Sequence, residues 1–177
     1  LPYLRRIHTE MDLTVLHVTH NFEEALGLAK HVGVIDEGRM LQVGTVKEVF
    51  THPRTRRIAA FVGIHNLWAP DAVEARDSDF ISSMLQRAIG PTNSQCICVR
   101  PDSVRIANHD GIDADFTTSA TVADIRWLGP VYELTLDVGV PLVATVSTQQ
   151  YQDIDCAPGD KVTVGVDAAA VRTIKDS

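Results

Sequence analysis

Two histidines, His17 and His20, lie in the stretch VLHVTHNFEEA and are the first residues whose type could do chemistry. Imidazole titrates closest to neutral pH, so it can exchange protons or bind an anion. A metal pair is the alternative, but we expect the two side chains to straddle the end of a strand and not to share a helix face, which argues against it. His20 is therefore the leading candidate for a functional residue.

The segments around His20 predict how it is positioned. Residues 13–18 are mostly apolar, as in a central parallel strand covered by helices on both faces. Asn21 with Glu24 three residues later predicts a capping box that opens an amphipathic helix ending near His31. The apolar face of that helix would be Phe22, Ala25, Leu26 and Ala29. His20 would then lie at the carboxyl end of a strand, beside a helix N-terminus, where open α/β sheets bind anions.

The string VLHVTHNFEEALGLAKHVGVIDEGRMLQVGTVKEVFTHP, continued by FVGIHN, resembles the region around the switch (H-loop) histidine of ABC transporter ATPases. The resemblance covers residues 1–64. It implies that His20 contacts the γ-phosphate of ATP and helps to place the attacking water. Phosphoryl transfer is catalysed chiefly by positioned hydrogen bonds and positive charge, which agrees with that role.

The resemblance also implies cofactors and partners. The intact subunit would use ATP and Mg²⁺, form a homodimer with a second copy, and work with transmembrane permease subunits and a solute-binding protein at the cytoplasmic face of the cell membrane. The printed sequence contains no G-x-x-x-x-G-K-[ST] loop, so we expect a C-terminal fragment that alone binds neither ATP nor Mg²⁺ and is inactive. A net charge of -7 and a pI near 5.4 argue against nucleic-acid binding.

Three more elements are predicted before residue 64. HVGVIDEGRMLQVGT alternates around Glu37-Gly38 and predicts a β-hairpin. Thr45 with Glu48 predicts a second capping box, and the helix that it opens should stop at His52-Pro53. Residues 54–62 predict one more helix, with Ile58, Phe61 and Val62 as its apolar side. We expect the domain boundary at about residue 64, giving domains 1–64 and 65–177.

The second half reads as a small all-β barrel. In WLGPVYELTLDVGVPLVATVS, Tyr132, Leu134, Leu136 and Val138 alternate with polar residues, and Gly139 turns the chain into a partner strand. Further strands are expected at 67–75, 80–85, 96–99, 120–127 and 161–166. The predicted fold class is thus α/β followed by all-β.

CICVRPDSVRIA, with ATVADIRWLGPVYELTLDVGVPLVATVS and PGDKVTVGVDAAAVRTI, resembles the TOBE domain that follows the ATPase domain in many importer subunits. It implies that the fold is the remnant of a P-loop NTPase ABC domain plus an OB-like TOBE β-barrel, most similar to the molybdate/tungstate type. TOBE domains of that type can bind the transported oxyanion. The possible oxyanion site is Ser147, Thr148, Gln149 and Gln150. Asp167 stands where a lysine is expected, and its carboxylate would oppose an anion.

Cys96, Cys98 and Cys156 give an odd count and no disulfide framework. Cys96 and Cys98 alternate with Ile97 and should point to the same side of a strand. No histidine pair has ligand spacing with them, so we interpret them as small core residues and predict no metal site.

Two hypotheses on function remain from the sequence. The first is the C-terminal part of the ATP-hydrolysing subunit of an importer, whose solute is molybdate, tungstate or a related oxyanion, or else sulfate, iron, a polyamine or a sugar. The second is a regulatory or independent oxyanion-binding TOBE module without catalysis. The stretch around His20 favours the first, because a stand-alone binding module has no use for it.

Overall fold

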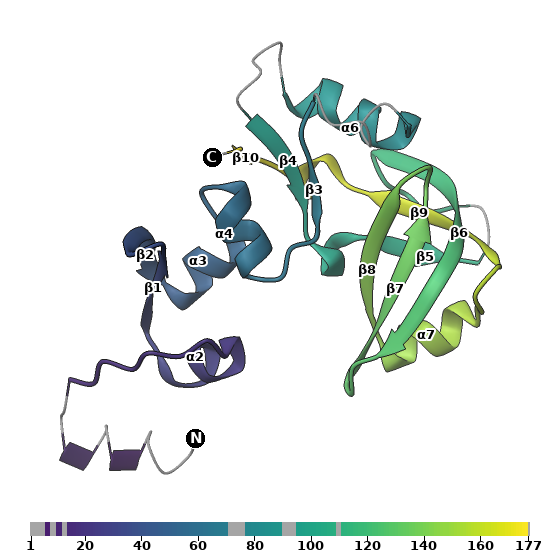
Figure 1. Cartoon of the computed structure of the whole chain (residues 1–177). Helices are drawn as coiled ribbons and strands as arrows, with labels where there is room; N and C mark the ends of the chain where they lie inside the picture. Colours follow the sequence, from purple (N-terminus) through teal and green to yellow (C-terminus); the bar gives the residue numbers. More distant parts are fainter. Residues whose placement is uncertain are drawn as a thin grey trace. The chain divides into compact units, whose positions relative to one another are not determined.

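The computed structural model describes residues 6–7, 10–11, 14–70, 77–89, 95–108 and 111–176, with only the backbone at Phe22 and Glu23. The chain divides into two compact units, Leu1–Arg54 and Thr55–Ser177, and each is described separately. Figure 1 shows the elements of both. No described helix has the length and apolar character needed to span a membrane.

The first unit contains helix α2 (Phe22–Leu28), strands β1 (His31–Asp36) and β2 (Arg39–Thr45), and helix α3 (Val46–Thr51). β1 and β2 form the predicted antiparallel hairpin, and the turn at Glu37-Gly38 is confirmed. Both turn residues have positive φ, which a tight hairpin turn with the right-handed twist of its strands requires.

The predicted capping box at the start of α3 is also confirmed. The Thr45 hydroxyl accepts from the Glu48 amide, and the Glu48 carboxylate accepts from the Thr45 amide at 2.8 Å. The helix ends at His52, as expected from the proline that follows. Buried Gln42 holds the next turn, because its amide donates to His52 O and accepts from Arg54 N.

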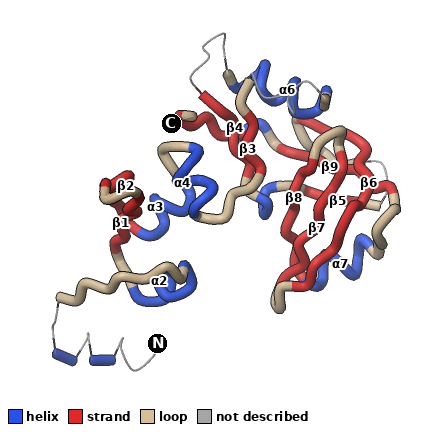
Figure 2. The backbone as a smooth tube through the Cα atoms, in the orientation of Figure 1, coloured by secondary structure: helices blue, strands red, loops and turns tan. Residues whose placement is uncertain are grey.

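The central parallel strand predicted over residues 13–18 is wrong. Residue 13 lies outside the described residues, and residues 14–19 form a loop, drawn in tan before α2 in Figure 2. Leu16 is 92% exposed and Val18 is 89% exposed. A parallel strand needs hydrogen-bonded neighbours and covering helices. The described part of the chain pairs no strand with this segment.

A five-stranded antiparallel sheet forms the body of the second unit, in the order β5-β9-β6-β7-β8. Its strands are β5 (Arg105–Ala107), β6 (Phe116–Trp127), β7 (Val131–Asp137), β8 (Pro141–Ser147) and β9 (Lys161–Val166). The long strand β6 pairs with β9 through its first half and with β7 through its second. A register shift between Val122 and Asp124 lies where β6 pairs with β7. A bulge of this kind bends a strand, which is how a small barrel curves.

The alternation predicted for β7 and β8 is confirmed in the core. Leu134, Leu136, Leu142 and Ala144 are fully buried. Leu134 opposes Ala144, and Leu136 opposes Leu142 across the two strands. Because successive side chains of a strand point to opposite faces, this register places the whole apolar set on one side of the sheet.

A second sheet has three strands in the order β10-β4-β3, with β3 (Asn66–Trp68), β4 (Gln95–Val99) and β10 (Val171–Lys175). Central β4 is buried on both faces. Ile97 and Val99 belong to the main core, whereas Cys96 and Cys98 belong to a smaller core with Ala59. The prediction that these cysteines are core residues is confirmed.

Helix α4 (Arg56–Phe61) occupies most of the predicted range 54–62. Ile58 and Ala59 are fully buried, but Phe61 is 47% exposed, so the predicted apolar side is only partly right. Ala59 lies in the small core beside β4, which is why α4 belongs to the second unit. The family boundary expected near residue 64 stays a prediction.

The strand predicted over residues 80–85 is wrong, because this segment is helix α6 (Asp79–Ala88). Buried Ser78 is its N-cap and accepts from the Ile81 amide. The buried side chains follow helical spacing: Phe80, Ile81, Met84 and Leu85. These side chains pack in the main core with residues of both sheets. The apolar residues of this segment therefore follow the 3.6-residue period of a helix and not the two-residue period of a strand.

The remaining elements are short. Helix α7 (Thr148–Ile154) follows β8 directly, and single 3₁₀ turns occur at η1 (Pro101–Ser103) and η2 (Ala168–Ala170). Figure 1 shows α6 and α7 at different ends of the five-stranded sheet. The strand predicted over 67–75 is observed only as β3, and residues 71–76 lie outside the described residues.

Candidate functional site

His20 lies in the loop immediately before α2 and is exposed to solvent. One hydrogen bond of the predicted capping box is present: the Asn21 side-chain oxygen accepts from the Glu24 backbone amide at 3.3 Å. His20 therefore precedes a helix N-terminus as predicted, but it follows a loop and not a strand.

Hydrogen bonds connect the residues on either side of His20. The Thr19 hydroxyl donates to the Glu24 carboxylate at 2.6 Å and accepts from the Asn21 amide at 2.9 Å. The His17 ring nitrogen Nε2 lies 3.2 Å from the same carboxylate oxygen. Thr19 and His17 thereby hold the pKa of Glu24 below its usual value, because both hydrogen bonds favour the charged carboxylate. The sequence pattern predicts only the capping role of Glu24, and the contact between Glu24 and Thr19 is seen only in the structure.

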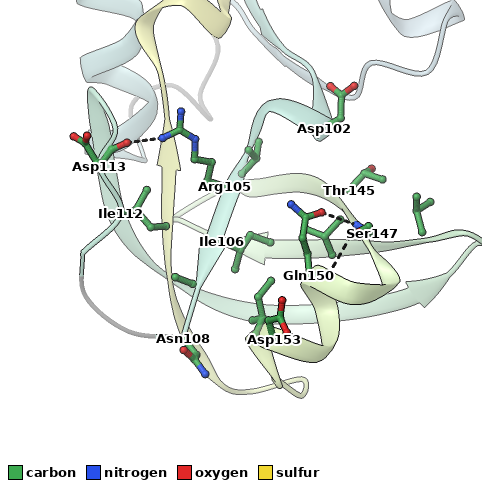
Figure 3. A pocket seen from close by; sticks show the side chains of 15 residues that line it. Asp102, Arg105, Ile106, Asn108, Ile112, Asp113, Thr145, Ser147, Gln150 and Asp153 are labelled. Carbon is green, nitrogen blue, oxygen red and sulfur yellow. Dashed lines mark hydrogen bonds between the residues drawn. The ribbon is translucent and has the colours of Figure 1, made fainter.

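The second candidate region is a hollow of about 630 Å³ in the five-stranded sheet unit, shown in Figure 3. Strand β5, the end of strand β8 and helix α7 supply most of its wall. Its apolar lining includes Val104, Ile106, Val146 and Ile154. Its polar lining includes Asp102, Arg105, Asn108, Asp113, Ser147, Gln150 and Asp153.

The predicted oxyanion residues lie at the start of α7, and two of them, Ser147 and Gln150, line the hollow. Their polar groups are engaged with each other. The Ser147 hydroxyl accepts from the Gln150 amide, and the Gln150 side chain accepts from the Ser147 amide at 2.9 Å, which closes a capping box. Thr148 donates to Pro130 O at 3.4 Å, and Gln149 donates to Asp153 at 3.1 Å. The polar groups of all four residues thus form hydrogen bonds within the chain, to helix α7 or to neighbouring residues.

Arg105 is a basic residue of the hollow that was not predicted from the sequence. Its guanidinium forms an ion pair with Asp167 and also donates to Asp113 O. The expectation that Asp167 simply repels an anion therefore needs correction, because its charge is paired. The signal was available, because Arg105 lies in RPDSVRIA, the motif that carries the TOBE resemblance.

The Arg-Pro-Asp of the same motif has a structural explanation. The Arg100 guanidinium donates to both carboxylate oxygens of Asp102, at 3.0 and 2.9 Å, across the turn η1. This bidentate pair lowers the pKa of Asp102, since it stabilises the charged carboxylate. Two of the acidic groups near the hollow, Asp102 and Asp167, are thus each paired with an arginine.

Within the described ranges, no group of three or more His, Cys, Asp or Glu side chains is placed to hold a metal ion. Burial raises the pKa of the Cys98 thiol to about 11, because the charged thiolate loses its hydration.

Residues 97–174 match the family model of the TOBE domain. The chain is 30% identical over 165 residues to the molybdate/tungstate import ATP-binding protein WtpC of Pyrococcus abyssi, covering 92% of this chain and 48% of the relative. It is also 30% identical over 166 residues to the sulfate/thiosulfate import ATP-binding protein CysA of Gloeobacter violaceus, covering 93% of this chain and 44% of that one. A solved molybdate-binding protein from Sporomusa ovata is 32% identical and covers 37% of this chain and 98% of that chain, with a TM-score of 0.34.

Residues 97–174, which include the five-stranded antiparallel sheet, thus match the TOBE domain family. The chain as a whole is homologous to the ATP-binding proteins of ABC importers. It spans about half the length of the curated relatives it matches.

Proposed function

We propose that this chain is the C-terminal part of the ATP-hydrolysing subunit of an ABC importer, with His20 as the switch histidine at the γ-phosphate of ATP. The observation that carries the proposal is the similarity of 92% of the chain to import ATP-binding proteins, which runs through the His20 stretch as well as the TOBE domain. The position of His20, exposed and directly before a capped helix, is compatible with contact to a phosphate bound elsewhere in the intact subunit.

The intact subunit would bind ATP and Mg²⁺, pair with a second copy and sit on permease subunits at the cytoplasmic face of the membrane. Residues 1–64 would complete the nucleotide-binding domain, and residues 65–177 would form the TOBE domain. A solute-binding protein would deliver the solute.

Molybdate or tungstate is the solute that we favour, because the TOBE motifs are most similar to the molybdate/tungstate type. The WtpC relatives of two Pyrococcus species have 30% and 29% identity over nearly the whole chain. Relatives named for sulfate/thiosulfate and for spermidine/putrescine reach 30% and 29%. Identity alone therefore does not select the solute. Selection would lie with the permease and the solute-binding protein.

The test is ATP hydrolysis by the intact subunit with His20→Ala, and with His31→Ala as a control at another exposed histidine. We expect His20→Ala to reduce kcat at least roughly a hundredfold while the affinity for ATP changes little, because a donor that acts on the transferring phosphoryl group contributes mainly in the transition state. His31→Ala should keep normal turnover. Normal kcat in the His20 variant would contradict the assignment.

A further inference from the structure

The loop that carries His20 is held by hydrogen bonds from both of its neighbours in sequence. Thr19, on one side, donates from its hydroxyl to the Glu24 carboxylate at 2.6 Å. Asn21, on the other side, gives its amide to the Thr19 hydroxyl at 2.9 Å and accepts from the Glu24 amide at 3.3 Å. Glu24 lies in the first turn of α2, so these bonds join the loop to the helix on both sides of His20.

His20 has no other anchor within the described residues, since no described group bonds to its ring and its side chain is exposed. The direction of an exposed side chain depends on its backbone dihedrals. Fixing the backbone of a residue costs conformational entropy, which the hydrogen bonds of the loop must offset. The bonds of Thr19 and Glu24 therefore hold the backbone from which the imidazole projects, in a segment that has no strand ladder.

We propose that Thr19 and Glu24 are positioning residues for His20, which hold its backbone in the orientation needed to meet the γ-phosphate. The role in hydrolysis rests on the proposed function of His20, whereas the ordering of the loop does not. The alternative is that these hydrogen bonds only cap the N-terminus of helix α2 and have no effect on His20. The two roles differ in one respect: loss of a positioning bond loosens residues 19–21 and leaves the helix intact.

NMR on the 177-residue chain separates these roles. The heteronuclear NOE of the His20 amide would be compared between wild type and Thr19→Val, which keeps the branched shape but removes the hydroxyl. Thr19→Ser restores the hydroxyl, and Thr14→Val is the matched control in the same loop. We expect the His20 NOE to fall in Thr19→Val, to return in Thr19→Ser and to stay unchanged in Thr14→Val, with NOE values inside α2 unchanged throughout. An unchanged His20 NOE, or loss of order along the whole of α2, would overturn the proposal.

The intact subunit supplies a kinetic readout. Thr19→Val and Glu24→Ala should each lower kcat about tenfold with KM for ATP nearly unchanged, since misplacing a catalytic group costs rate more than binding. Thr19→Ser should restore kcat. If His20→Ala retains normal kcat, the proposed function fails, but the NMR result still stands. If His20→Ala is inactive and Thr19→Val turns over normally, the positioning role fails alone.

Discussion

The buried Asn66 side chain pairs with the backbone of Val143 as a neighbouring strand would. Its amide nitrogen donates to Val143 O at 2.7 Å, and its amide oxygen accepts from Val143 N at 2.8 Å. Val143 lies in β8, the edge strand of the five-stranded sheet, and Asn66 lies in β3 of the three-stranded sheet. One side chain thus protects an edge and joins the two sheets.

Asn66→Ala should destabilise the second unit by about 2–3 kcal/mol, because it leaves two backbone groups of Val143 without partners. Both tryptophans, Trp68 and Trp127, lie in this unit, so denaturant unfolding followed by tryptophan fluorescence reports on it. Exposed Asn108→Ala is the matched control and should change stability by less than about 0.5 kcal/mol. Equal effects of the two variants would refute this role of Asn66.

The backbone of Asp77 lies so close to Gly139 that we expect no side chain to be tolerated at this position. Gly139 has φ +93°, and an added Cβ would lie 2.3 Å from Asp77 O. Gly129 has a similar φ of +88° but open space around it. We expect Gly129→Ala to cost about 1 kcal/mol from the backbone strain alone. Gly139→Ala should cost clearly more, because the added clash is with backbone. Thermal unfolding of both variants measures the difference.

The buried thiol of Cys98 should make stability fall at high pH. Burial raises its pKa to about 11, so the folded state keeps the proton that the unfolded chain releases near pH 9. The resulting stability is complete below pH 9 and is lost as the pH rises through about 11. At two pKa units it amounts to about 2–3 kcal/mol. The difference in unfolding free energy between wild type and Cys98→Ala should therefore shrink between pH 8 and pH 11. A difference independent of pH would contradict this.

The TOBE domain should respond weakly to tungstate, molybdate or sulfate. The four predicted donors at 147–150 are engaged in the chain, and the cation of Arg105 is paired with Asp167. A thermal-shift series with each anion, and with chloride at matched ionic strength, measures the response. Asp167→Asn frees Arg105 and should increase any shift with tungstate. A rise of several degrees in the wild type at micromolar tungstate would show that the engaged donors rearrange around the anion.

The sequence by itself determined the features that depend on neighbours within a few residues. The hairpin around Glu37-Gly38 and the capping box of Thr45 with Glu48 are set by backbone groups three or four positions apart. The alternation of β7 and β8 was equally readable, because the side-chain period of a strand is two wherever it pairs. The family resemblance, and with it His20 as the candidate residue, also came from contiguous residues.

Tertiary structure decided the features whose partners are distant in sequence or missing. Residues 14–18 have the composition of a buried strand, yet no described strand pairs with them. The pattern of residues 80–85 predicts a strand, but these residues form a capped helix that packs on the main core. Arg105 meets Asp167 across 62 positions, and Asn66 meets Val143 across 77. Local pattern cannot predict such contacts, because their energy comes from groups that only the folded chain brings together.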